Sequence, residues 1–321
     1  MSRRVVALSS AVVVVTAETM DLVTVATVGI VAANKILEAL LFYVAVVVCN
    51  KNMHVWRKQT YIVWASVAIG LLLVLSIFFS SQKIRDWYQV ASVRMYPNTE
   101  RAFAYGEKHF DSASAGQYDL DLAYTFFRAA MAEDDKYPYV NHELARIEFL
   151  RGDNETAMLF INKEISLYGE KSPKSYYVRG LIEGYMGKYA AAAKDYRVYI
   201  SHDPTNWAAT NDLAWVLLKD NRPQEAVDAI DEILPLWPEN PWLLNSKATA
   251  LYELGRYKEA SVAAELAAQT VLAINGKEWS KAYPGNDPLI GEAGAAAFQH
   301  AVFQNMHTIS LALQKDAKDM R

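Results

Sequence analysis

Several positions in the C-terminal half of the chain recur at a fixed interval of 34 residues. The interval separates Gly187, Asn221 and Gly255, then Tyr189, Pro223 and Tyr257, then Ala192, Ala226 and Ala260. Pro204 and Pro238 recur at the same interval, and a proline there stops one helix from running into the next unit. A fixed period of this length is typical of a helical solenoid, in which each unit packs only against its neighbours.

The residue types at these positions resemble the tetratricopeptide repeat (TPR) family, which places small residues in both helices and a proline at the end. The first clear unit has Gly180, Gly187, Tyr189, Ala192, Tyr196 and Pro204. The second has Leu213, Ala214, Ala226, Ile230 and Pro238, and the third has Ala248, Leu251, Gly255, Tyr257, Ala260 and Ala264. Small side chains at such positions let paired helices approach closely.

The resemblance implies an all-α fold in which helices alternate in antiparallel pairs. The three clear units cover about Pro173–Ile274, and two weaker ones cover Pro138–Ser172 and Asn98–Tyr137, the latter with an enlarged turn. We therefore expect four to five repeats. That number gives a continuous core, because each repeat buries its apolar face on the next.

Beyond the last repeat, Asn275–Pro288 is rich in turn residues and also contains Trp279 and Tyr283. A final helix is predicted over about Leu289–Lys318, since Phe298, Val302, Met306, Ile309 and Leu313 follow three- and four-residue steps. Capping of the open end of the solenoid is the favoured role of this helix, and partner binding is the alternative.

The N-terminal part differs from the rest in charge and hydropathy. Residues 1–89 carry eight basic and four acidic side chains, whereas residues 90–321 carry 24 basic and 32 acidic ones. Residues 61–80 form an uncharged stretch long enough to cross the roughly 30 Å hydrocarbon core of a bilayer. With residues 30–49 as a second span, the sequence predicts a transmembrane helical hairpin within a membrane anchor, residues 1–89, followed by a solenoid, residues 90–321.

Two features of this anchor leave alternatives open. The apolar segment 5–15 is a cleaved signal, a third short span or an extension of the first helix. Lys35 and Glu38 lie three residues apart on one helix face and form an intramembrane polar pair, either at the interface or against a partner helix. A multi-pass protein of a bacterial inner membrane is expected, in contact with the lipid bilayer. Basic residues flank both ends of the hairpin, so charge does not assign the side that the TPR part faces.

The sequence excludes several classes of protein. Its 52% hydrophobic content is too high for a disordered chain, and Cys49 as the single cysteine excludes a disulfide scaffold. The acidic solenoid argues against a nucleic-acid partner. No phosphate-binding, zinc-protease or serine-hydrolase motif is present, and the six histidines do not form metal-ligand pairs. We expect no catalytic residue, no metal and no cofactor, and we interpret the chain as a non-enzyme.

The first helices of TPR units line a concave groove, and the resemblance implies a binding surface at fixed positions of each repeat. In this sequence those positions hold mostly aromatic and amide side chains, which bind protein or sugar ligands through a large rigid contact area with polar groups at its edge. The predicted partner-binding residues are Tyr139, His142, Arg146, Phe149, Tyr177, Leu181, Asn211, Trp215, Trp242, Asn245 and Tyr252. The groove has too few basic residues for the carboxylate clamp of chaperone-binding TPR domains.

Three functions are compatible with this organisation. The first is a membrane-anchored TPR scaffold that recruits partner proteins, in exopolysaccharide synthesis or export, since two spans and four or five repeats resemble the membrane subunit of the Pel exopolysaccharide system. The second is an assembly factor for secreted clients, similar to the TPR subunit of cytochrome c maturation. The third, ranked last, is an enzyme or transporter that uses the Lys35 and Glu38 pair.

Overall fold

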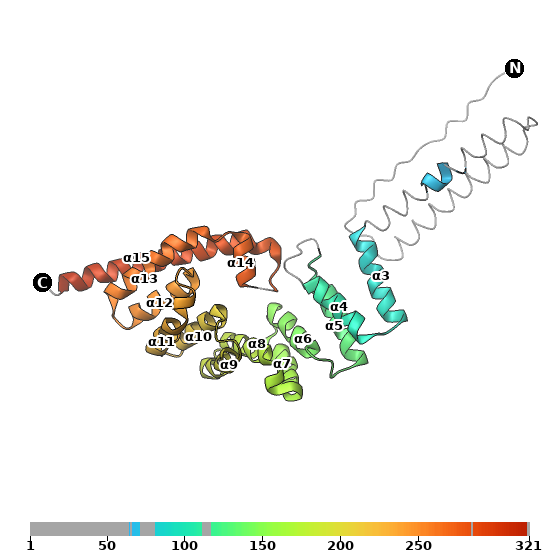
Figure 1. Cartoon of the computed structure of the whole chain (residues 1–321), viewed down its shortest axis with the longest axis horizontal. Coiled ribbons are helices and arrows are strands. Elements are labelled where there is room, and N and C mark those ends of the chain that lie inside the picture. The colour runs from blue at the N-terminus through green and yellow to red at the C-terminus, as the bar shows by residue number, and fades with distance from the viewer. Residues whose placement is uncertain (1–63, 65, 71–80, 111–116, 284, 320–321) are drawn as a thin grey trace, which may run out of the picture. The chain divides into compact units, whose positions relative to one another are not determined.

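The computed structural model describes residues 64, 66–70, 81–110, 117–283 and 285–319. The chain divides into two compact units, Met1–Ser80 and Ser81–Arg321. In the first unit, the described residues 64 and 66–70 are helical. The elements below belong to the second unit (Figure 1).

The second unit is built from antiparallel helix pairs, and the described residues contain no strand. The all-α solenoid is therefore confirmed. The pairs are α4 (Thr99–Phe110) with α5 (Leu120–Glu133), α6 (Val140–Leu150) with α7 (Asn154–Tyr168), α8 (Pro173–Tyr185) with α9 (Tyr189–His202), α10 (Trp207–Lys219) with α11 (Pro223–Ile233), and α12 (Pro241–Glu253) with α13 (Tyr257–Thr270). Short 3₁₀ turns follow three of the second helices: η1 (Gly169–Lys171), η2 (Leu234–Leu236) and η3 (Val271–Ala273).

The 34-residue period has its physical origin in the turn within each pair. Gly187, Asn221 and Gly255 have φ angles of 76°, 56° and 73°, the left-handed region that glycine adopts without strain. The residue after each one donates its N–H back to a carbonyl in the last helical turn, as Lys188 does to Glu183 at 2.8 Å. This bond closes the first helix and sends the chain directly into the second.

In two of the pairs, a glycine of the first helix faces an aromatic ring of the second. A Cβ atom added at Gly180 would lie 3.1 Å from the ring of Tyr196, and one added at Gly106 would lie 2.6 Å from the ring of Phe127. Both rings are fully buried. The helices can approach this closely only because the facing position has no side chain.

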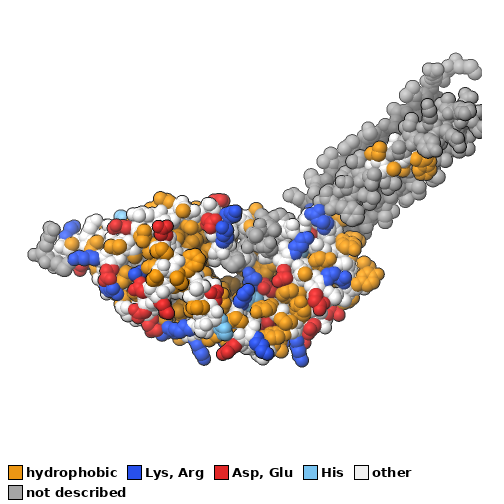
Figure 2. Space-filling model, in the orientation of Figure 1, with side chains coloured by type: hydrophobic (Ala, Val, Ile, Leu, Met, Phe, Trp, Pro, Cys, Tyr) orange, Lys and Arg blue, Asp and Glu red, His pale blue; other side chains and the backbone are white. Residues whose placement is uncertain are grey.

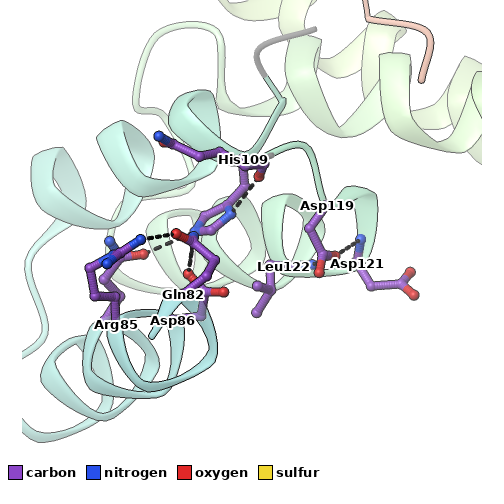
Figure 3. Close-up of polar contacts among 9 residues, drawn as sticks. Gln82, Arg85, Asp86, His109, Asp119, Asp121 and Leu122 are labelled. Atoms are coloured by element: carbon purple, nitrogen blue, oxygen red, sulfur yellow. Dashed lines mark hydrogen bonds and ion pairs between the residues drawn. The ribbon is translucent and has the colours of Figure 1, made fainter. Parts of the chain in front are cut away.

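The N-terminal helix α3 (Gln82–Met95) packs on the first pair through a buried histidine of α4. His109 Nε2 lies 2.9 Å from Gln89 Oε1, and its Nδ1 lies 3.1 Å from the Gln117 carbonyl oxygen. The same Nε2 lies 3.7 Å from Asp86 Oδ1 (Figure 3). The Asp119 side chain caps α5 by accepting the N–H of Leu122. Polar contacts thus join α3 to the turn that begins α5.

At the other end, α14 (Gly276–Ala282) and η4 (Pro288–Ile290) lead into the long helix α15 (Gly291–Asp319). Helix α15 packs along α13, where Val302 and Ile309 are buried against the core. The predicted C-terminal helix thus covers the open side of the last repeat.

The predicted membrane localisation is contradicted, because no helix in the described part of the chain has the length and apolar composition needed to span a bilayer. Helix α15 has 29 residues, but glutamine, asparagine and histidine side chains interrupt its apolar positions. The predicted hairpin (residues 30–49 and 61–80), the segment 5–15 and the Lys35 and Glu38 pair lie outside the described residues, except for residues 64 and 66–70.

The turn geometry makes a prediction about stability. Gly187→Ala should destabilise the chain by about 1 kcal/mol, because a Cβ there meets no neighbour but the left-handed φ remains costly. Asn221→Gly, the matched change at the equivalent turn, should stay within about 0.5 kcal/mol of the wild type. Urea unfolding of both variants measures these changes in the free energy of unfolding. Equal losses in the two variants would contradict the left-handed conformation of the two turn residues.

Candidate functional site

The first helices of successive pairs lie side by side and line a cavity that is partly open to solvent. Helices α6, α8, α10 and α12 form most of its wall, and Ala282, Tyr283, Asn286 and Phe298 line it from the C-terminal part of the chain. The cavity has a volume of about 710 Å³, within the range of about 300–1,000 Å³ usual for ligand sites.

The structure gathers most of the residues predicted to bind a partner around this cavity. Those that line it are His142, Arg146, Phe149, Tyr177, Leu181, Asn211, Trp215, Trp242 and Asn245. Tyr139 and Tyr252 do not line it. Tyr139 precedes α6 with a φ of 66° and donates its N–H to Glu164 Oε1, and the Tyr252 ring packs on Tyr257 instead. The partner-binding role of all eleven residues remains a prediction.

Aromatic rings form two rows in the cavity wall. In one row the ring centroids of Phe149 and Tyr185 are 5.2 Å apart, and those of Tyr185 and Trp215 are 5.6 Å apart. In the other row Trp242 lies between Trp207, at 5.0 Å, and Phe298 of α15, at 4.7 Å and nearly parallel. Such contacts fix the rings before any ligand arrives.

The polar groups between these rows are also held in place. Asn211 Oδ1 accepts a hydrogen bond from Ser246 Oγ at 2.8 Å, which ties α10 to α12. Asn245 Oδ1 accepts one from Asn305 of α15 at 3.0 Å. The Tyr177 hydroxyl donates to Asp212 Oδ2 at 2.7 Å. The wall therefore presents oriented amide and carboxyl groups among rigid rings.

Charge at the α6 end of the cavity is largely compensated. Arg146 pairs with Glu143 at 2.7 Å and lies 4.5 Å from the centroid of the Phe110 ring. Burial raises the pKa of Glu143, although Arg146 opposes this shift. His142 is buried and lies 3.0 Å from Ser175 Oγ, and burial lowers its pKa to about 3, so it is neutral at pH 7.

A segment that we call the closing segment, residues 275–283 and 285–290, crosses the concave side. The Tyr118 hydroxyl donates to the Gly285 carbonyl at 2.7 Å, and Trp242 Nε1 donates to the Tyr283 hydroxyl at 3.0 Å. Gly285 has a φ of 96°, and a Cβ there would lie 2.7 Å from the Arg146 guanidinium. The surface is hollowed between this segment and the repeats, and acidic and basic side chains intermix around it (Figure 2).

Sequence reasoning missed several cavity residues: Lys174, Tyr185, Tyr199, Trp207, Asp212, Tyr283 and Phe298. Tyr185 follows Leu181 by one helical turn, so the repeat spacing contained a signal for it. Tyr283 and Phe298 lie beyond the repeats. No period places them, and only the folded chain brings them to Trp242. The described residues include no group of His, Cys, Asp and Glu suited to a metal ion.

A family model supports the repeat assignment in the middle of the solenoid. Residues 177–241 match the family model described as tetratricopeptide repeat. No protein of curated function matches the chain in sequence. Among solved structures, the MamA protein is 18% identical, with a TM-score of 0.46 over 58% of this chain and 94% of its own. A tetratricopeptide repeat protein from Parabacteroides merdae is 15% identical, with a TM-score of 0.48 over 70% of this chain and 91% of its own.

The buried His142 makes a prediction about acid stability. Its folded pKa of about 3 lies below its ordinary value of 6.5, so the unfolded chain binds the extra proton and stability falls as the pH drops through this window. Between about pH 7 and about pH 5, His142 should lower the free energy of unfolding by about 2 kcal/mol. Urea unfolding at both pH values should show a smaller drop in the free energy of unfolding for His142→Gln than for the wild type. An equal drop in both would contradict a neutral, buried His142.

The closing segment makes a second prediction. Tyr118→Phe removes the hydrogen bond to Gly285, so local opening of residues 276–283 should become about fivefold more frequent, equivalent to about 1 kcal/mol. Hydrogen–deuterium exchange measures this opening. Tyr88→Phe, on an exposed tyrosine of α3, is the control. Unchanged exchange in Tyr118→Phe would show that this bond does not hold the segment.

Proposed function

We propose that the chain is a non-catalytic scaffold that recruits a partner protein by taking a short segment of it into the cavity. The observation that carries the proposal is the convergence of nine predicted groove residues, from α6, α8, α10 and α12, around one cavity. The tetratricopeptide repeat match supports it, since the family binds protein partners.

The cavity wall has the composition of a protein-binding site. Rigid aromatic rings provide contact area at low entropic cost, and the amides of Asn211 and Asn245 suit the backbone of a bound peptide. The preformed hydrogen bonds reduce the cost of ordering on binding. An aromatic site of this kind also agrees with the lack of a catalytic motif in the sequence.

The closing segment limits what the cavity can accept. Because contacts from Tyr118 to Gly285 and from Trp242 to Tyr283 bridge the concave side, a long peptide does not fit along the whole solenoid. A loop, a chain end or a few residues of a partner fit the volume of about 710 Å³. Tyr185, which is 66% exposed, lies at the rim, where such a segment enters.

The identity of the partner would distinguish between two more specific roles suggested by the sequence, one in exopolysaccharide synthesis or export and one in the assembly of secreted clients. A glycosyltransferase or its regulator supports a place in exopolysaccharide synthesis or export. An apocytochrome supports a role in the maturation of secreted clients.

Photocrosslinking tests the proposal. A benzoylphenylalanine residue at position 185 should crosslink a partner in cells, whereas the same residue at position 88 should not, although Tyr88 is equally exposed at 64%. Tyr185→Ala should then weaken binding of the captured segment by about tenfold, as expected for an aromatic contact residue, and Tyr88→Ala should leave it unchanged. Isothermal titration measures both affinities.

Two outcomes would contradict the proposal. One is equal crosslinking at positions 185 and 88, which indicates contact without a defined site. The other is full affinity in Tyr185→Ala, which places the partner on another surface.

A further inference from the structure

A single carboxyl group in the cavity wall has no cation beside it. Asp212 of α10 is partly buried, lines the cavity and accepts the hydrogen bond from Tyr177. Among the described residues, no Lys, Arg or His forms an ion pair with it. Glu143, the other acidic residue of the cavity, already has Arg146 as its partner. Asp212 is therefore the negative charge of the site that has no cation paired to it.

The surroundings of Asp212 are aromatic. Tyr177, which donates to it, has ring centroids of Tyr199 at 5.3 Å and Tyr196 at 5.6 Å. Trp215 lies one helical turn further along α10, with Tyr185 beside it. Aromatic faces attract cations through their quadrupole, and this attraction strengthens where water is excluded. A carboxylate between such rings favours the same kind of ligand.

Other ligand classes fit this point of the cavity less well. An anion would meet the Asp212 carboxylate, while Arg146, which would attract it, is held by Glu143 and by the Phe110 ring. A purely apolar ligand would leave the carboxylate buried without an opposite charge, which is costly. A lysine or arginine side chain has an apolar stem for the rings and a charged head for the carboxylate.

We propose that Asp212 and the aromatic walls around it form a recognition site for an organic cation, presented by the partner as a lysine or arginine side chain. This inference rests on the proposed function, since it names what the captured segment carries into the cavity. Lys174, at the start of α8, also lines the cavity, and it discourages the entry of a segment with several positive charges.

Titration of the site follows from its burial. Burial raises the pKa of Asp212 to about 6, and hydrogen bonds from Tyr177 and Asn211 limit the shift. The facing titratable groups are the hydroxyls of Tyr177, Tyr196 and Tyr283, whose own pKa values burial raises, so they stay neutral at pH 5 to 8. No charged group of α11 or α12 shifts the pKa of Asp212. Below pH 6 the carboxyl is protonated, and its attraction for a cation is lost.

Three short peptides test the proposal on the full chain: acetyl-Gly-Lys-Gly-amide, its arginine counterpart and its uncharged norleucine counterpart. Tryptophan fluorescence should show saturable binding of at least one cationic peptide at about pH 7.5, about tenfold tighter than the norleucine peptide. Affinity for it should fall about tenfold at about pH 5, in proportion to the ionised fraction of Asp212. The preferred peptide distinguishes lysine from arginine.

Two variants complete the test. Asp212→Asn keeps the hydrogen bond from Tyr177. It should lose the preference for a cationic peptide and the part of the pH dependence of binding that Glu143 does not explain. Asp228→Asn, on an exposed aspartate of α11 outside the cavity, should behave as the wild type. Should Asp212→Asn fail to fold, the pH series on the wild type still decides.

Equal affinity for the norleucine peptide, or cation binding that is unchanged at low pH or in Asp212→Asn, overturns the cation site. The proposed function is judged separately. A partner segment that crosslinks at position 185 and binds equally well after its basic residues are replaced by norleucine leaves the scaffold standing and removes only the cation. Failure to crosslink removes the scaffold itself.

Discussion

The close contact within each helix pair is the constraint on which the whole solenoid depends. At Gly180 and Gly106 the missing side chain leaves room for the rings of Tyr196 and Phe127, which fill the core of their repeats. With the second helices packed behind them in this way, the first helices lie side by side on the concave face. The cavity is a consequence of that stacking, because each first helix brings its own rings and amides to the same side.

The closing segment changes the chemistry of this surface. An open groove exposes its polar groups to water, whereas Tyr283 and Phe298 add a second wall opposite the repeats. Burial lowers the pKa of His142 and raises that of Asp212, so that at pH 7 the histidine is neutral and the aspartate has a negative charge without a cation paired to it. The selectivity that we propose for a cation therefore originates in Asp212 and in the aromatic rings of the repeats beside it.

The sequence predicted the repeats well because each repeat is a local unit. The turn at Gly187, the small residue Gly180 and the spacing of Tyr177 and Leu181 all lie within a single period, so counting found them. It also gave nine cavity residues. Asp212 was passed over because its neighbours Asn211 and Trp215 occupied the expected positions, and the repeat pattern assigns no role to the residue between them. The closing segment contacts residues far from it in the sequence. These contacts lie outside the 34-residue repeat, so no local sequence pattern predicts them.

The membrane expectation came from hydropathy, charge and segment length, which describe composition without placing a segment in a fold, and the described helices do not support it. The central claim concerns the cavity, and fluorine NMR of the full chain with 5-fluorotryptophan tests it most directly. Once the partner segment is added, the signals of Trp207, Trp215 and Trp242 should shift while those of Trp87 and Trp237, outside the cavity, stay in place. Shifts confined to Trp87 or Trp237 would contradict the account, because the partner would then bind elsewhere on the chain.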